Sequence, residues 1–151
     1  MMNELNLPPF DARLRQKAQG RPEIFDVLRR RYVALTPEEW VRQHFVHFLI
    51  ARKGYPKGLL SNEVELRVGE KRLRCDSLLY DTQLRPRMII EYKAPDVELT
   101  QRVFDQITTY NLLLHVDYLV LSNGLSHYCC RMDYTRRSYS FLPDVPDYTA
   151  L

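Results

Sequence analysis

An apolar strand that carries charge is the feature that most constrains the fold of this chain. Residues 87–93 read Arg-Met-Ile-Ile-Glu-Tyr-Lys, and apolar side chains at consecutive positions are typical of an interior strand buried on both faces. Because side chains alternate along a strand, Glu91 and Lys93 share one face and Tyr92 lies on the other. Charge in such a strand indicates a functional site.

The preceding segment places another carboxylate opposite this strand. Residues 71–80 are also strand-like and are followed by a run of turn-forming residues. If Tyr80 pairs with Arg87, Asp76 lies directly across from Glu91, with the two Cα atoms about 4.5–5.5 Å apart. Two like charges at that distance repel each other. A hard divalent cation would compensate them, because carboxylate oxygens suit Mg²⁺ or Mn²⁺.

Capping signals and hydrophobic periodicity predict the other elements. Residues 36–39, Thr-Pro-Glu-Glu, form a helix start with Thr36 as N-cap and Glu39 closing a capping box. Residues 24–35 fit either an edge strand or a short helix. The remaining expectations are a first helix to about residue 53, strands at 62–68 and 116–122, a helix at 100–115, and a final hairpin formed by 125–132 and 138–142.

These elements predict an α/β (α+β) fold with an αβββαβ core, in which helices flank a central mixed sheet and a C-terminal hairpin follows. The length of 151 residues fits one domain. We expect an N-terminal extension at 1–35, the core at about 36–128 and a tail at 143–151. An odd count of 3 cysteines and no apolar stretch of membrane-spanning length favour a soluble protein of the reducing cytoplasm with no membrane partner.

Five short segments occur in a fixed order along the chain: 36–43 (TPEEWVRQ), 74–76 (RCD), 90–95 (IEYKAP), 106–111 (QITTYN) and 122–124 (SNG). Together they resemble the PD-(D/E)XK nuclease superfamily, and within it the N-terminal nuclease domain of type I restriction enzyme R subunits. The resemblance covers roughly residues 36–128. Cys75 stands where the family motif has proline. No G-x-x-x-x-G-K-[ST] phosphate loop occurs in the sequence, so the translocating motor of such a subunit is not part of this chain.

The resemblance implies a role for each charged residue of the two central strands. Asp76, Glu91 and the backbone carbonyl of Tyr92 would hold Mg²⁺, with Mn²⁺ as a substitute. Lys93 would orient or deprotonate the attacking water, because a lysine close to a dication in a partly buried site has a lowered pKa. The implied activity is metal-dependent hydrolysis of phosphodiester bonds in DNA by an endonuclease or nuclease module of the restriction-modification type.

The helices supply three further candidates by the same resemblance. Glu38 is favoured over Glu39 as an additional acidic metal ligand, because Glu38 shares a stripe with the apolar face of the first helix. Gln106 and Tyr110, one helical step apart, match a Gln-x-x-x-Tyr motif that supports the site or grips the DNA backbone.

Each of these residues also has a purely structural interpretation. Glu91 and Lys93 form an ordinary ion pair in one reading, and Glu38 is explained by helix capping alone. Gln106 and Tyr110 fit a buried amide and a core aromatic residue equally well. The opposition of Asp76 to Glu91 is the observation that favours a catalytic site.

Three functional hypotheses follow. The first is a Mg²⁺-dependent DNA endonuclease that acts alone, as a homodimer or in a larger restriction-type assembly. The second is a catalytically inactive nucleic-acid-binding or assembly module with the same fold, which binds DNA in a salt-sensitive manner without cleaving it. The third is a protein–protein adaptor whose hairpin at 125–142 offers a strand edge to a partner.

Overall fold

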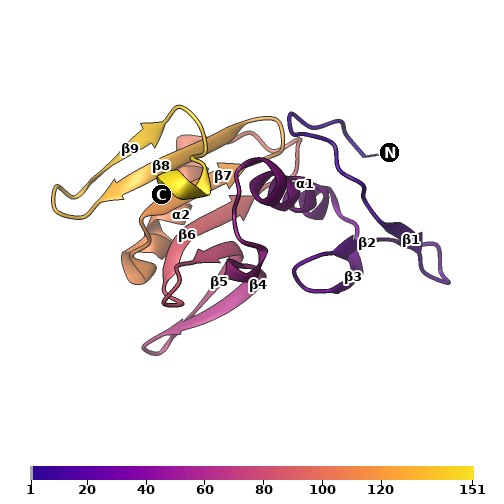
Figure 1. Cartoon of the computed structure of the whole chain (residues 1–151), viewed down its shortest axis with the longest axis horizontal. Helices are drawn as coiled ribbons and strands as arrows, with labels where there is room; N and C mark the ends of the chain where they lie inside the picture. The colour runs from indigo at the N-terminus through magenta and orange to yellow at the C-terminus, as the bar shows by residue number, and fades with distance from the viewer. Residues whose placement is uncertain (1) are drawn as a thin grey trace.

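The computed structural model describes residues 2–151, except for the side chains of Tyr110 and Leu112. Its described elements form a six-stranded mixed sheet, two α-helices and a separate three-stranded antiparallel sheet (Figure 1). In chain order they are β1 (Leu14–Gln16), β2 (Pro22–Asp26), β3 (Arg31–Ala34), α1 (Pro37–Arg52), a 3₁₀ turn (Lys57–Leu59), β4 (Leu60–Val68), β5 (Lys71–Tyr80), β6 (Pro86–Tyr92), α2 (Gln101–Leu114), β7 (Tyr118–Ser122), β8 (His127–Asp133), β9 (Ser138–Leu142) and a 3₁₀ turn (Tyr148–Ala150).

Helix α1 begins where the sequence predicted, but its capping box does not close. The hydroxyl of Thr36 accepts a hydrogen bond from the Glu39 backbone N–H over 3.0 Å, as an N-cap does. The carboxylate of Glu39 does not return the bond to Thr36 and instead pairs with Arg29 and Arg42. The capping-box assignment of Glu39 is therefore wrong, because two arginines compete for the carboxylate more strongly than a neutral backbone N–H.

The three-strand meander β4–β5–β6 has the predicted order, with a local change in register. The pairs Ser77↔Ile90, Leu78↔Ile89 and Leu79↔Met88 follow the predicted alignment. A bulge between Leu79 and Tyr80 then sets Tyr80 opposite Pro86 in place of Arg87. The assumed Tyr80–Arg87 pair is wrong. The alignment on the site side of the bulge is nevertheless the predicted one, so Asp76 and Glu91 are the next opposed positions after Ser77 and Ile90.

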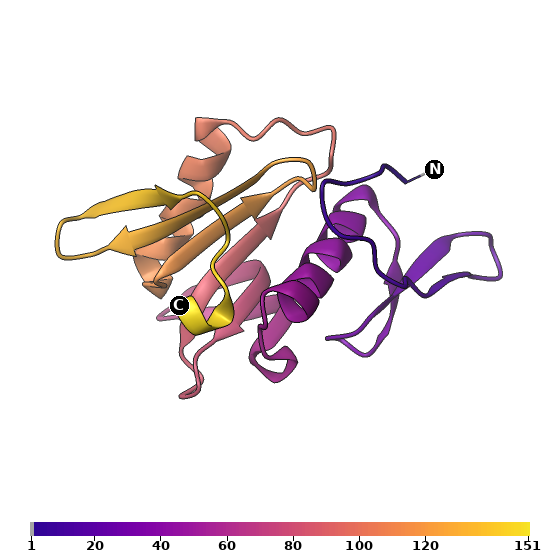
Figure 2. The ribbon, with the colours of Figure 1, turned by 45° about the horizontal axis from the view of Figure 1, so that its top comes forward.

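Helix α2 connects β6 to β7, and these two strands run parallel in the middle of the sheet. Thr100 caps α2 by accepting from the Val103 N–H, as predicted, and His115 ends the helix in the left-handed conformation at φ 53°. The sheet continues antiparallel through β8 to β9. The predicted C-terminal hairpin is confirmed, and it extends past α2 at one end of the sheet (Figure 2).

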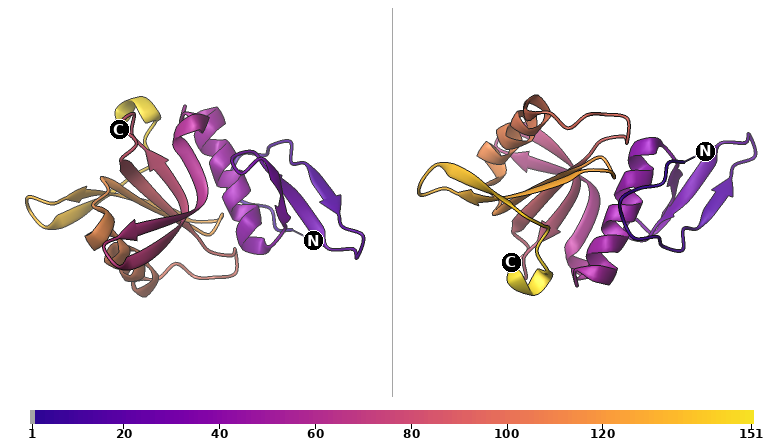
Figure 3. Two further views of the ribbon diagram at one scale, coloured as in Figure 1. Left: turned by 90° about the horizontal axis from the view of Figure 1, so that it is seen from below. Right: turned by 90° about the horizontal axis from the view of Figure 1, so that it is seen from above.

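The segment before α1 forms a second small sheet. Strands β1, β2 and β3 pair antiparallel in that order, so residues 24–35 are strand and not helix. They form parts of two strands joined by a turn, however, and of these only β3 is an edge strand. Helix α1 lies between this small sheet and the six-stranded sheet (Figure 3). The strand signal was weak because these segments are short and rich in arginine, and pairing with one another stabilises them more than their intrinsic propensity.

Each helix covers one face of the six-stranded sheet with its own core. The α1 side contains Val41, Phe45 and Leu49, packed against sheet residues that include Ile90 and Tyr92. The α2 side contains Phe104 and Ile107, packed against apolar residues of β5, β6 and β7. In the part of the chain that is described, no helix combines the length and apolar character needed to cross a membrane.

Candidate functional site

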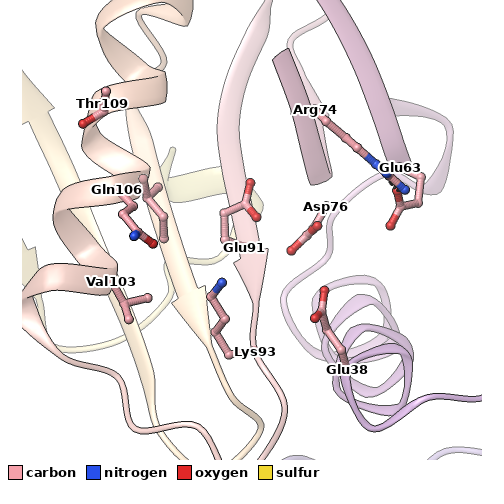
Figure 4. A pocket seen from close by; sticks show the side chains of 10 residues that line it. Glu38, Glu63, Arg74, Asp76, Glu91, Lys93, Val103, Gln106 and Thr109 are labelled. Carbon is pink, nitrogen blue, oxygen red and sulfur yellow. Dashed lines mark hydrogen bonds and ion pairs between the residues drawn. The ribbon is translucent and has the colours of Figure 1, made fainter. Parts of the chain in front are cut away.

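A cavity of about 820 Å³ opens between α1, β5, β6 and α2. Figure 4 shows the carboxylates of Glu38, Asp76 and Glu91 directed into this space, with Gln106 on the opposite wall. The cavity is lined by Glu38 of α1, Glu63 of β4, Arg74 and Asp76 of β5, Glu91 of β6, Lys93 just after β6, and Val103, Gln106, Ile107 and Thr109 of α2. Of the seven residues predicted for the site, five therefore line one cavity with their side chains; the other two are Tyr92, predicted through its backbone carbonyl, and Tyr110, whose side chain is outside the described part of the chain.

Asp76 lies at the point where β5 and β6 stop pairing. Its Oδ2 atom accepts a hydrogen bond from the backbone N–H of Tyr92 over 2.9 Å. The N–H and C=O of one strand residue point to the same side, so the Tyr92 carbonyl also points toward β5. The Asp76 carboxylate and the Tyr92 carbonyl are therefore on the same side of β6, and their use as metal ligands stays a prediction.

The second central carboxyl group is that of Glu91, and its ionised form is unfavourable in the folded chain. Burial raises the pKa of Glu91, and hydrogen bonding to Asp76 together with the negative charge of Asp76 raises it further, while Lys93 opposes the shift. Among the described residues, Glu91 Oε1 has no hydrogen-bond partner although it is buried. A buried carboxylate oxygen that lacks a donor is suited to binding a cation.

The first turn of α1 adds the third carboxylate. Burial raises the pKa of Glu38, and the negative charge of Asp76 contributes to the rise. Glu39 is not among the residues that line this cavity, and its carboxylate accepts hydrogen bonds from Arg29 and Gln43. The choice between the two glutamates therefore falls on Glu38, which lines the cavity as the sequence pattern favoured.

Two further residues line the cavity: Lys93, which directly follows β6, and Gln106 of α2. The backbone N–H of Lys93 donates to the Ser122 carbonyl of β7 over 2.9 Å, which holds the residue in line with β6 while its side chain lines the cavity. Gln106 is exposed on α2 and is not a buried core amide. The side chain of Tyr110 lies outside the described part of the chain, so its predicted role stays a prediction.

The sequence reasoning missed the buried cation beneath the carboxylates, Arg42. Its guanidinium donates to the Asp76 carbonyl over 2.9 Å and to Glu63 Oε1 over 2.6 Å, and its Nε lies 3.2 Å from Glu39 Oε2. The arginine is 3% exposed. Arg42 is four residues after Glu38 and so lies on the same face of the helix, which was the only hint in the sequence that it is near the site. No local pattern distinguishes a buried arginine from an exposed one.

A series of hydrogen bonds between polar side chains connects β6 to the small N-terminal sheet. The buried Tyr92 hydroxyl donates to Ser77, Ser77 donates to Asn62, and Asn62 donates to Asp26 of the small sheet, over 2.8, 2.6 and 3.0 Å. Asp26 also pairs with Arg29. These bonds link the strand that carries Glu91 to the N-terminal sheet.

The donor set fits a hard divalent cation better than any other group. In the described residues, no three His, Cys, Asp or Glu side chains are gathered at the distances of metal ligands. The oxygen atoms that face the cavity are nonetheless those that Mg²⁺ and Mn²⁺ prefer. Burial, with a further contribution from the negative charge of Asp76, raises the pKa of both Glu38 and Glu91, so the charged forms of these neighbouring carboxyl groups are unfavourable without a cation.

The raised pKa of Glu91 predicts how pH affects stability. A carboxyl group with a raised folded-state pKa binds its proton more tightly in the folded chain, so stability falls as pH rises above the ordinary value of 4.5. In a chelator at pH 8 we expect Glu91→Gln to be about 1–3 kcal/mol more stable than the parent. The free energies of unfolding of the two proteins, measured by urea unfolding, should become equal near pH 4.

The exposed Glu65 of β4 provides the matched control. Its side chain is 64% exposed, so Glu65→Gln should leave the pH profile of stability unchanged. A Glu91→Gln protein that is no more stable than the parent at pH 8 would show that the ionised Glu91 carboxylate does not destabilise the folded chain.

A family model matches most of this chain. The sequence profile of a family described as "Type I restriction enzyme R protein N terminus" matches residues 37–146. A structure described as a fragment of an HsdR subunit of a type I restriction enzyme from Vibrio vulnificus YJ016 is similar, with 18% identity and a TM-score of 0.52 over 74% of this chain and 24% of that one. The sheet and helix arrangement therefore matches that fold.

Another solved structure, described as a DrdV–DNA complex, has 22% identity and a TM-score of 0.44 over 72% of this chain and 11% of that one. No curated protein matches the sequence. The chain spans about a quarter of the length of the HsdR fragment that it resembles.

Proposed function

The chain belongs to the family of type I restriction enzyme R protein N termini, and from this premise we propose that it is a metal-dependent nuclease module that hydrolyses phosphodiester bonds in DNA. The observation that carries the proposal is the convergence of Glu38, Asp76, Glu91 and Lys93 on one cavity. Three carboxylates and a lysine supply metal ligands and a proton acceptor. A metal-dependent mechanism of phosphodiester hydrolysis uses both.

The proposed metal ligands are Asp76, Glu91, Glu38 and the Tyr92 carbonyl. A Mg²⁺ or Mn²⁺ ion at this position would neutralise charge on the phosphoryl oxygens and lower the pKa of water. Arg42 holds the backbone of Asp76 through the Asp76 carbonyl, which keeps the Asp76 side chain at the end of the paired strands. The Tyr92 N–H fixes the orientation of the Asp76 carboxylate.

Lys93 is the proposed general base or water-positioning residue. It lines the same cavity as Glu91, two residues earlier on the same strand. The side chain would hold the attacking water or take its proton at Nζ. Gln106 faces the acidic residues from α2, so its amide would contact the DNA backbone beside the scissile phosphate.

The proposed partners are DNA and the other parts of a restriction-type assembly. The family is named for R proteins, and the chain spans only a fraction of the HsdR fragment. A larger protein or complex would supply DNA translocation and sequence recognition, because the 151 residues contain no phosphate-loop motif.

The direct test incubates the purified chain with supercoiled plasmid in Mg²⁺, in Mn²⁺ and in a chelator. We expect nicked and then linear DNA only with a divalent cation. Salt-sensitive binding of DNA without any cleavage would support the inactive-module hypothesis instead. A chain that neither binds nor cleaves DNA at low salt would exclude both hypotheses.

A further inference from the structure

The two edges of the six-stranded sheet differ in how they are protected. Strand β4 carries Glu63, Glu65 and Arg67, and Glu63 adopts a left-handed backbone at φ 54°. Charges and irregular backbone are the usual means of preventing strand addition at an edge. Strand β9, at the other edge, reads Ser-Tyr-Ser-Phe-Leu and has neither feature.

Strand β9 also exposes aromatic surface. Phe141 is 53% exposed and Tyr139 is 39% exposed, and the two rings contact each other and Phe104 of α2. Tyr128 of β8 contacts Phe141 on the same face and is 44% exposed. Exposed aromatic side chains along an unprotected edge are characteristic of an interaction surface.

The hydrogen-bond pattern shows which backbone groups of β9 are free. The Met132 N–H donates to the Asp117 carbonyl on the β7 side, so the neighbouring Arg131 points its backbone groups toward β9. Arg131 is opposite Ser140. It follows that Ser138, Ser140 and Leu142 bond to β8, while the N–H and C=O groups of Tyr139 and Phe141 point outward.

We propose that β9 is a dimerisation edge, and that it pairs antiparallel with β9 of a second copy of this chain about a two-fold axis at Ser140. In this register Tyr139 of one copy is opposite Phe141 of the other. Both residues present outward backbone groups, so each such pair exchanges two hydrogen bonds and all four outward N–H groups are satisfied. The opposed aromatic rings add a favourable cross-strand contact.

Charge complementarity favours this register over its neighbours. It brings the turn that carries Arg136 of each copy close to Asp144 of the other, just beyond the ends of the paired strands. Both side chains are largely exposed, at 84% and 76%, although Asp144 also lies 3.6 Å from Lys53 Nζ. Moving the axis toward Phe141 would set Tyr139 opposite Pro143, which has no N–H to donate. Moving the axis toward Tyr139 would set Phe141 opposite Arg137, which is in a left-handed turn conformation at φ 52°.

The first test uses the unmodified full chain. Sedimentation equilibrium should show a dimer that dissociates on dilution, detectable for a Kd of up to about 100 μM. In amide exchange followed by NMR, the N–H groups of Tyr139 and Phe141 should become protected as concentration rises. Ser138 and Ser140 should be protected at every concentration. A chain that stays monomeric, or a dimer without protection at Tyr139 and Phe141, overturns the proposal.

The second test uses charge reversal at two exposed positions. Thermal unfolding must first show that each variant folds, because Asp144 also pairs with Lys53 and accepts a hydrogen bond from the Val145 N–H. Arg136→Asp and Asp144→Arg should each weaken the dimer about tenfold or more, because each brings like charges close together at both ends of the interface. The double variant should restore the affinity. If the double variant does not regain the dimer affinity of the parent, the proposed register is wrong. Glu65→Lys on the opposite edge is the control and should leave the dimer unchanged.

Discussion

Replacing Asp76 with alanine is expected to reduce metal-dependent DNA cleavage by about 10³-fold or more, which corresponds to about 4 kcal/mol of transition-state stabilisation. Asp76 is central to the proposed cation site, since Glu38 and Glu91 both respond to its charge. The alanine variant should also lose the increase in thermal stability that Mn²⁺ gives the parent protein. Plasmid nicking rates and thermal unfolding with and without Mn²⁺ measure the two effects.

Lys93→Ala separates catalysis from metal binding in the same pair of assays. The lysine is not a proposed ligand, so this variant should lose cleavage and keep the stabilisation by Mn²⁺. Glu65→Gln serves as a control with full activity, because its carboxylate is on β4 away from the cavity lining. Cleavage by the Asp76→Ala protein at the parental rate would remove the basis of the proposed mechanism.

Replacing Arg42 with alanine is expected to lower the free energy of unfolding by about 3–5 kcal/mol. The arginine is buried among Glu39, Glu63 and the Asp76 carbonyl. Its removal leaves two carboxylates without their shared cation. Breaking one side of a buried ion-pair group is costly for this reason. Urea unfolding at pH 7 gives the measurement.

Arg74→Ala is the matched control, since Arg74 pairs with the same Glu63 but its side chain is 76% exposed. Solvent already screens that pair, so we expect a much smaller loss of stability than for Arg42→Ala. Adding Glu39→Gln and Glu63→Gln to an Arg42→Met protein should recover part of the lost stability. Equal effects of Arg42→Ala and Arg74→Ala would show that burial of the arginine contributes nothing.

The position of the candidate site was predictable because the signals for it are local or depend on simple alternation. The interior strand at 87–93, the facing strand at 71–80 and the Thr36 helix cap each appear in a few consecutive residues. The bulge at Leu79 and Tyr80 left the predicted alignment of Asp76 with Glu91 intact. It did so because it lies on the side of the paired segment away from the site.

Sequence alone determined the order of the core elements, the two helix starts and the candidate residues, because capping and periodicity act between neighbours along the chain. Only the tertiary structure decided that Glu39 pairs with arginines and that Arg42 lies buried beneath Asp76. It also decided that residues 14–34 form their own sheet and that β9 leaves a free edge. These outcomes depend on which distant segments compete for the same charge or backbone group, and no local pattern records that competition.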